Sequence, residues 1–112
     1  MTDHGPVSEP VFHILLSLVD GPLHGYRIIQ EVEERTGGAV TLGAGTLYSA
    51  IKRMLGWGWL KEASPPTPGE DARRRYYGLT PAGSRVVRSG AQRLEGLVRH
   101  ARAKRVLRDR PA

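Results

Sequence analysis

The fold is decided by one stretch, Gly45-Thr46-Leu47-Tyr48-Ser49-Ala50-Ile51-Lys52-Arg53-Met54, which Gly58-Trp59-Leu60 follows. Its apolar residues recur at the i, i+4, i+7 spacing of one helix face, which can pack on a core: Leu47, Ile51 and Met54. Its other faces carry polar or cationic side chains: Thr46, Ser49, Lys52 and Arg53. A short helix with an apolar back and a basic front, ended by glycine and a strand-like run, is typical of a DNA-recognition helix. We therefore expect these four side chains to contact DNA, at phosphates or base edges.

The charge of the chain also favours an anionic partner, most simply nucleic acid. Over 112 residues the net charge is +6 and the pI is near 10.3. The charge is unevenly spread, because residues 1–39 hold two bases against six acids and residues 82–112 hold nine bases against two acids. This asymmetry indicates a specific basic surface on one modest domain.

Several classes of protein are disfavoured by what the sequence lacks. There is no cysteine, so neither a disulfide framework nor a thiolate metal site can form. The longest apolar run, Ile14-Leu15-Leu16, is too short to span a bilayer, and the N-terminus does not resemble a signal peptide. The four histidines are scattered, and no nucleophile has an evident partner base. We expect a cytoplasmic protein that is no enzyme and has no metal, cofactor or membrane partner.

The elements expected along the chain follow the order of a winged helix-turn-helix. Residues 1–8 are expected to be a disordered leader. Apolar spacing predicts helices over 9–20, 24–36 and about 44–57, with a brief strand over 40–42. Strands over 59–63 and 73–79 are joined by a proline-rich loop, which makes 9–79 a mainly α domain with a small β-hairpin. A capped last helix is predicted over 80–108, before a tail at 109–112.

The sequence also indicates roles for residues of the second helix, over 24–36, and for the two tryptophans. The side chains of this helix that are expected to face the core are Tyr26, Ile28, Ile29 and Val32. Arg27 and Gln30 are predicted to contact phosphates, because this helix crosses the backbone in a helix-turn-helix. Trp57 and Trp59 are interpreted mainly as core or hinge packing.

Three adjacent arginines, Arg73, Arg74 and Arg75, are predicted to contact DNA from the wing. On a strand, Arg73 and Arg75 would share one face and Arg74 would take the other. A wing arginine can insert into a narrow minor groove, where the negative potential is deep. The alternative is that these arginines pair with Glu70 and Asp71 just upstream.

The last helix carries a narrow apolar seam that predicts a second copy of the chain as partner. The seam residues are Val87, Ala91, Leu94, Val98 and Ala101, with Leu97 beside them. The bases at 99, 102, 105 and 108 either face phosphate or keep the dimer soluble, and the second interpretation is favoured.

The chain resembles the PadR family of bacterial transcriptional regulators over roughly residues 11–100. Three blocks in the right order carry the resemblance: Gly21-Pro22-Leu23-His24-Gly25-Tyr26, Gly45-Thr46-Leu47-Tyr48 with Lys52-Arg53, and Tyr76-Tyr77-Gly78-Leu79-Thr80-Pro81-Ala82-Gly83. The resemblance implies that Tyr48 lies near the DNA backbone and that one C-terminal helix makes the dimer. The chain departs from the family pattern at two places. Gly43 stands where the family often has a serine that caps the recognition helix, so either Gly43 or Thr41 would cap it here. No aromatic residue follows Tyr77.

Together these features predict a homodimeric DNA-binding regulator, most simply a repressor, on a pseudo-palindromic operator. Its two recognition helices would enter major grooves about 34 Å apart. A small-molecule effector at the dimer interface is compatible with this hypothesis. The alternative is a winged-helix module whose basic face docks an acidic protein partner.

Overall fold

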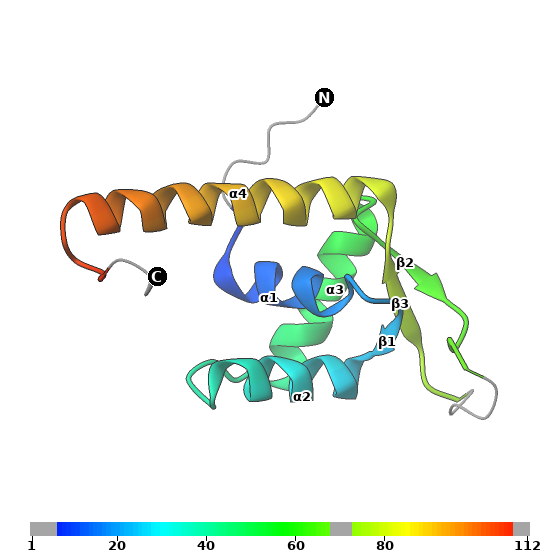
Figure 1. The fold of residues 1–112 in the computed structure, drawn as a ribbon. Coiled ribbons are helices and arrows are strands. Elements are labelled where there is room, and N and C mark those ends of the chain that lie inside the picture. The colour runs from blue at the N-terminus through cyan, green and yellow to red at the C-terminus, as the bar shows by residue number, and fades with distance from the viewer. Residues whose placement is uncertain (1–6, 68–72, 109–112) are drawn as a thin grey trace.

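The computed structural model describes residues 7–67 and 73–108. In chain order the elements are α1 (Glu9–Ser17), β1 (Leu23–His24), α2 (Gly25–Thr36), α3 (Ala44–Gly56), β2 (Leu60–Ala63), β3 (Tyr76–Leu79) and α4 (Pro81–Ala103). The strands form a three-stranded antiparallel sheet in the order β1-β3-β2. Figure 1 shows α1, α2 and α3 gathered beneath one half of α4, with the sheet at the end of that half. The predicted mainly α winged-helix fold is confirmed, while the tail at 109–112 and most of the expected leader lie outside the described residues.

A single core joins the first helices to the sheet and to the start of α4. The apolar back of α3 is buried as predicted, since Leu47 and Met54 are fully covered and Ile51 is 2% exposed. It packs with Ile14 and Leu15 of α1 and with residues of α2, β2 and β3 in one cluster. Burial of such side chains supplies roughly 1.5–3 kcal/mol each. The back of α3 is therefore held by the domain, and its other faces remain outside.

Helices α1 and α4 begin at side-chain caps, whereas α3 begins without one. The Ser8 hydroxyl accepts a hydrogen bond from the Val11 amide at 3.4 Å, and the Thr80 hydroxyl accepts one from the Gly83 amide at 3.0 Å. Such caps satisfy amides that have no partner inside the helix. The N-cap of α3 is Gly43, with no side-chain cap bond, so Thr41 does not substitute for a capping serine.

Three predicted boundaries and one predicted strand are wrong. The first helix ends at Ser17, three residues early. Residues 40–42 form no strand: they follow the end of α2 without regular structure, and the Val40 amide donates to the Thr36 hydroxyl at 3.1 Å. The last helix ends at Ala103, since Arg105 adopts a left-handed φ of 63° and the Val106 amide donates back to the Ala101 carbonyl at 2.8 Å. The wing strand begins at Tyr76, three residues after the predicted start.

Two aromatic residues expected inside the protein lie largely outside it. Tyr26 is 56% exposed, whereas Ile28 is fully buried. The face of α2 that packs on the core therefore contains Ile28 and not Tyr26. Trp57 is 53% exposed, and its ring contacts that of Trp59 with centroids 4.7 Å apart. Trp59 packs partly against the core, as expected.

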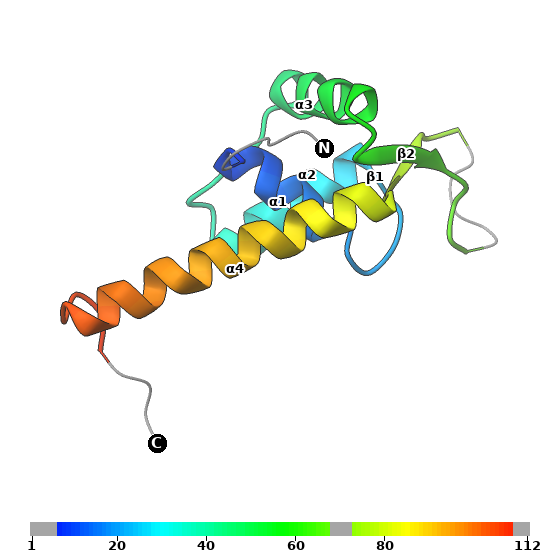
Figure 2. The same cartoon turned by 90° about the horizontal axis from the view of Figure 1, so that it is seen from above.

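Helix α4 docks on the domain with its first half only. Val86 and Val87 are buried in the core, and two glycines allow the helix backbone to come close. A Cβ at Gly83 would collide with the Trp59 carbonyl group, and one at Gly90 would lie 3.0 Å from the Phe12 ring. Figure 2 shows the second half of α4 extending past the rest of the domain. Across the described ranges, no helix combines the length and apolar character that a bilayer crossing requires.

Candidate nucleic-acid interface

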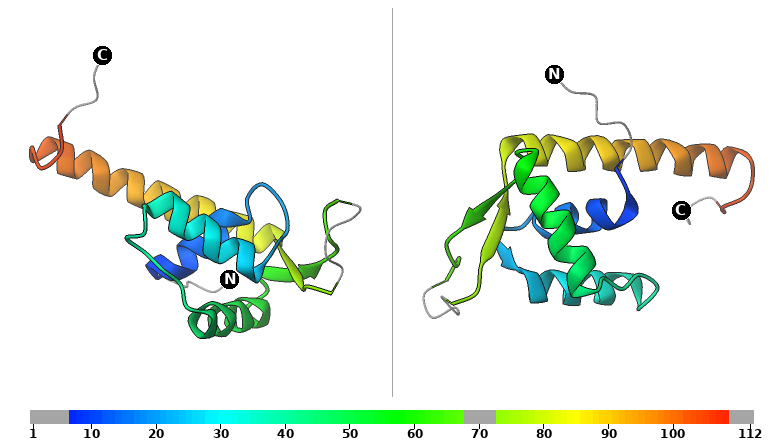
Figure 3. Two further views of the ribbon diagram at one scale, coloured as in Figure 1. Left: turned by 90° about the horizontal axis from the view of Figure 1, so that it is seen from below. Right: turned by 180° about the vertical axis from the view of Figure 1, so that it is seen from behind.

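The outer face of α3 carries all five side chains that were predicted for it. Thr46, Tyr48, Ser49, Lys52 and Arg53 are exposed. Figure 3 shows α3 lying across the outside of the molecule, with no other element over it. The Arg53 guanidinium donates to the Ser49 hydroxyl at 3.4 Å, one helical turn away. This bond orients the arginine along the helix surface, on the side opposite the buried Leu47 and Met54.

No carboxylate of the described residues pairs with the cations of α3. Within the described residues the ion pairs join Arg27, Arg35 and His13 to glutamates of α1 and α2, and none involves Lys52 or Arg53. When lysine and arginine neutralise phosphates, the cations condensed on the DNA are released, so two exposed cations without an ion pair among the described residues suit a duplex. No group of three or more metal-ligand side chains occurs among the described residues.

Tyr48 connects the outer face of α3 to the start of α2. Its hydroxyl lies so close to Gly25 that a Cβ there would clash, and the ring ζ carbon would be 2.7 Å from that Cβ. Tyr48 is nevertheless 48% exposed. It can therefore fix the approach of the two helices and still present one side of its ring to the exterior.

The phenol of Tyr77 lies on the core side of the wing, near Tyr48. Burial raises the pKa of Tyr77 above its ordinary value, and the neighbouring Tyr48 and Glu62 act in the same direction. The cation of Arg75 acts in the opposite direction and lowers that pKa. Tyr77 is thus a neutral group of the core that links β3 to α3.

The predicted phosphate contacts of α2 are less open than those of α3. The Arg27 guanidinium lies 3.7 Å from the Glu31 carboxylate and 3.4 Å from that of Glu34. A phosphate would have to compete with these two carboxylates for it. Gln30 is half-buried on the same helix.

The wing arginines lie before β3 and not on it, so the predicted alternation of their side chains does not apply. Arg73, Arg74 and Arg75 are all exposed. Arg74 contacts His24 and Tyr26 at the start of α2, with its Nη1 atom 3.1 Å from His24 Nδ1. The alternative pairing with Glu70 and Asp71 involves residues outside the described ranges. His24 was missed as a site residue, although its place just before Gly25 could have indicated a helix cap.

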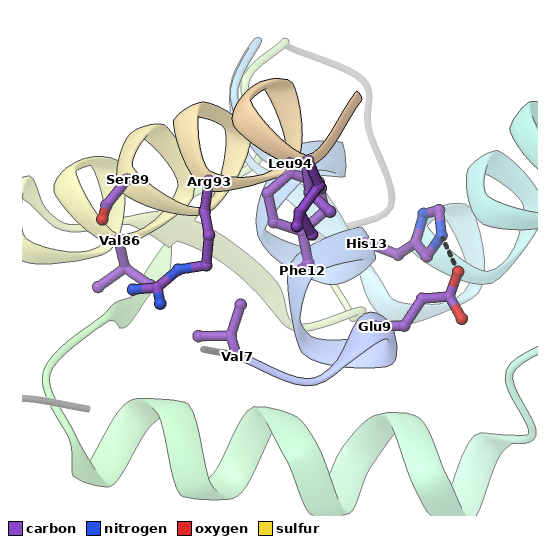
Figure 4. Close-up of a pocket in the computed structure, with 10 residues that line it drawn as sticks. Val7, Glu9, Phe12, His13, Val86, Ser89, Arg93 and Leu94 are labelled. Carbon is purple, nitrogen blue, oxygen red and sulfur yellow. Dashed lines mark ion pairs between the residues drawn. The ribbon is translucent and has the colours of Figure 1, made fainter. Parts of the chain in front are cut away.

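The predicted dimer seam divides into a buried part and an exposed part. Val87 is 7% exposed and belongs to the domain core, so its assignment to a dimer interface is wrong. Leu94 and Leu97 are 48% and 62% exposed, Ala91 is exposed, and Val98 and Ala101 are half-buried. The two leucines line a groove of about 470 Å³ between α1 and α4, together with Val7, Phe12 and Val86 (Figure 4). Glu9, His13 and Arg93 also line this groove.

Comparisons with known proteins identify the family. The model of the transcriptional regulator PadR-like family matches residues 14–89. A transcriptional regulator from Clostridium thermocellum has a similar structure, with TM-score 0.69, 28% identity and coverage of 88% of this chain and 96% of that one. A PadR family transcription regulator from hypervirulent Clostridium difficile gives TM-score 0.73, 26% identity and coverage of 86% and 97%.

One curated relative is similar in sequence. It is an uncharacterized 37.1 kDa protein in transposon TN4556 of Streptomyces fradiae, 39% identical over 88 residues. The aligned part is 76% of this chain but spans only 24% of that relative.

Proposed function

This chain belongs to the PadR-like family of transcriptional regulators, and from that premise we propose that it acts as a homodimer whose α3 helices read a pseudo-palindromic operator. DNA-binding transcriptional regulation follows from the family, whose members are regulators and not enzymes. The exposed cations of α3, which form no ion pair within the described part of the chain, carry the proposal for the site. Lys52 and Arg53 face outward on a helix whose apolar back is fully held by the core. Thr46, Tyr48 and Ser49 would add contacts to the phosphate backbone.

The homodimer is supported by the apolar line along α4. Val86, Gly90, Leu94, Leu97 and Ala101 follow one another at intervals of three or four residues, on the side that faces α1. The first two contact the domain, and the line continues where the helix extends beyond it (Figure 2). Exposed leucines of this kind are stabilised when another apolar surface covers them. A second copy of α4 and α1 presents the same groove and the same leucines.

We infer the mode of regulation from where such a dimer would bind. A compact dimer that occupies an operator within a promoter excludes polymerase by its volume, so we infer repression in the cytoplasm. The groove between α1 and α4 would lie at the dimer interface, where an effector could alter the distance between the two α3 helices.

Selection of bound duplexes from a random pool tests this proposal. We expect enrichment of an inverted repeat whose half-sites are about 34 Å apart, one turn of DNA. Footprinting should then show protection of successive major grooves on one side of the duplex. Enrichment of a single half-site would contradict the dimer, and a pool without enrichment would favour a basic face that docks an acidic protein.

A further inference from the structure

His24 links the wing to the helix-turn-helix in three ways. Its Nδ1 atom accepts a hydrogen bond from the Arg27 amide at 3.1 Å and so caps α2. Its backbone belongs to β1 and is paired with Tyr76 of β3. Its ring meets the Tyr76 ring edge-on at 5.4 Å and lies parallel to that of Tyr26 at 6.5 Å. One side chain therefore contacts both α2 and the strand that returns from the wing.

Arg74 adds a contact from the wing to the same rings. Its Nη1 atom lies 3.1 Å from Nδ1 and 3.3 Å from Nε2 of His24. Its Cζ atom lies 5.6 Å from the centroid of the Tyr26 ring. A planar guanidinium is suited to such faces, whereas an ammonium group cannot stack in the same way.

The position of Arg74 in the chain gives this contact a mechanical role. The β1–β3 ladder has only two pairs, and His24 opposite Tyr76 is the one nearest the wing loop. Arg74 precedes Tyr76 by two residues, so its contacts continue the attachment of the wing beyond the last backbone pair. The hairpin partner β2 belongs to the wing itself, which leaves the β1 side to fix the wing relative to α2.

We propose that Arg74 is a positioning residue, which holds the wing against His24 and Tyr26 so that Arg75 meets DNA at a fixed place relative to α3. This inference rests on the proposed function and assigns different tasks to two adjacent arginines. A guanidinium lying against two rings would have to leave both of them to bind a phosphate. Arg75 is the next residue, is also exposed and carries the same charge, so it provides a matched control.

The contact itself is tested in the free protein by nuclear magnetic resonance. The side-chain protons of Arg74 should show ring-current shifts that Tyr26→Leu reduces and that Tyr26→Leu combined with His24→Asn largely removes, while those of Arg75 stay unchanged. Arg74 shifts equal to those of a solvated arginine in the wild-type chain would overturn the proposal without involving DNA.

The role in binding is tested on a duplex selected by the wild-type chain. Arg74→Lys keeps the charge but loses the stacking, so we expect about tenfold weaker binding, against about twofold for Arg75→Lys. His24→Asn retains a capping side chain and removes the ring. Arg74→Gln combined with His24→Asn should be about as weak as either variant alone, whereas Arg75→Gln combined with His24→Asn should show additive losses.

The outcomes separate this role from the proposed function. Additive losses for Arg74→Gln and His24→Asn, or full binding by Arg74→Lys, would identify Arg74 as an independent phosphate contact and overturn the inference alone. A wild-type chain that retains no duplex from the pool would contradict the proposed function and this role with it.

Discussion

Replacing Gly25 by alanine should destabilise the protein through Tyr48 and not through the backbone. Gly25 is the first residue of α2 and has an ordinary negative φ, so alanine fits the local conformation. Helix propensity alone would make Gly25→Ala stabilising by up to about 1 kcal/mol. The added methyl group, however, would overlap the Tyr48 hydroxyl and come within 2.7 Å of its ζ carbon.

The magnitude depends on how easily the tyrosine moves. Overpacking by one methyl group typically costs about 1–3 kcal/mol. Tyr48 is 48% exposed and can swing outward, which favours the lower part of that range. After the gain in propensity we expect a net loss of about 1 kcal/mol, or roughly 4 °C in Tm. The displaced ring should also weaken DNA binding, because Tyr48 lies on the predicted interface.

A double-mutant cycle of Gly25→Ala and Tyr48→Ala, with stability measured by thermal and urea unfolding, tests whether the loss arises from the contact with Tyr48. In a Tyr48→Ala background the methyl group has room, and Gly25→Ala should become neutral or stabilising. The change of sign corresponds to a coupling of about 1–2 kcal/mol between neighbouring residues. If Gly25→Ala changed stability equally in both backgrounds, the contact between Tyr48 and Gly25 would not be what selects glycine there.

Three further predictions address other parts of the structure. Burial raises the pKa of Tyr77 above 10.0, so the unfolded chain loses the phenol proton at a lower pH than the folded protein, and the free energy of unfolding should be full below about pH 10 and fall as the pH rises further. Measured by urea unfolding, this alkaline loss of stability should be smaller in Tyr77→Phe than in the wild-type chain. An equal loss in both proteins would contradict the prediction. Gly83→Ala should cost more than about 2 kcal/mol in thermal unfolding, because its methyl group meets the Trp59 carbonyl. At Gly96 a methyl group would make only an ordinary contact with the Arg99 side chain at 3.8 Å, so Gly96→Ala should stabilise the protein by up to about 1 kcal/mol. Equal effects of the two substitutions would refute the close docking of α4. Leu97→Glu should convert the dimer to monomer in sedimentation velocity without unfolding it, and an unchanged mass would place the dimer interface elsewhere.

The sequence predicted the fold well where the pattern is local. Leu47, Ile51 and Met54 mark the buried face of α3 by spacing alone, and Thr80-Pro81 marks the start of α4. Both signals arise from single helical turns, which neighbouring elements do not alter.

The failures occur where distant parts of the chain meet. Strand β1 has two residues, and its pairing with β3 depends on segments more than fifty positions apart in the chain. Tyr26 has a helical spacing that suits the core, but its ring lies outside against His24 and Arg74. Val87 fits an apolar seam, although it is already buried in the core of its own domain. Periodicity identifies an apolar face without identifying which surface covers it.

The measurement that tests the central claim most directly is the affinity of the double variant Lys52→Ala, Arg53→Ala for the selected duplex. Two lost contacts at about 1–3 kcal/mol each predict a fall of roughly a hundredfold or more, with Tm nearly unchanged because both side chains are exposed. The control variant Arg85→Ala, Arg88→Ala removes the same charge from exposed positions of α4 and should bind almost as the wild-type chain does. Wild-type affinity in the Lys52→Ala, Arg53→Ala protein would show that the outer face of α3 does not read DNA.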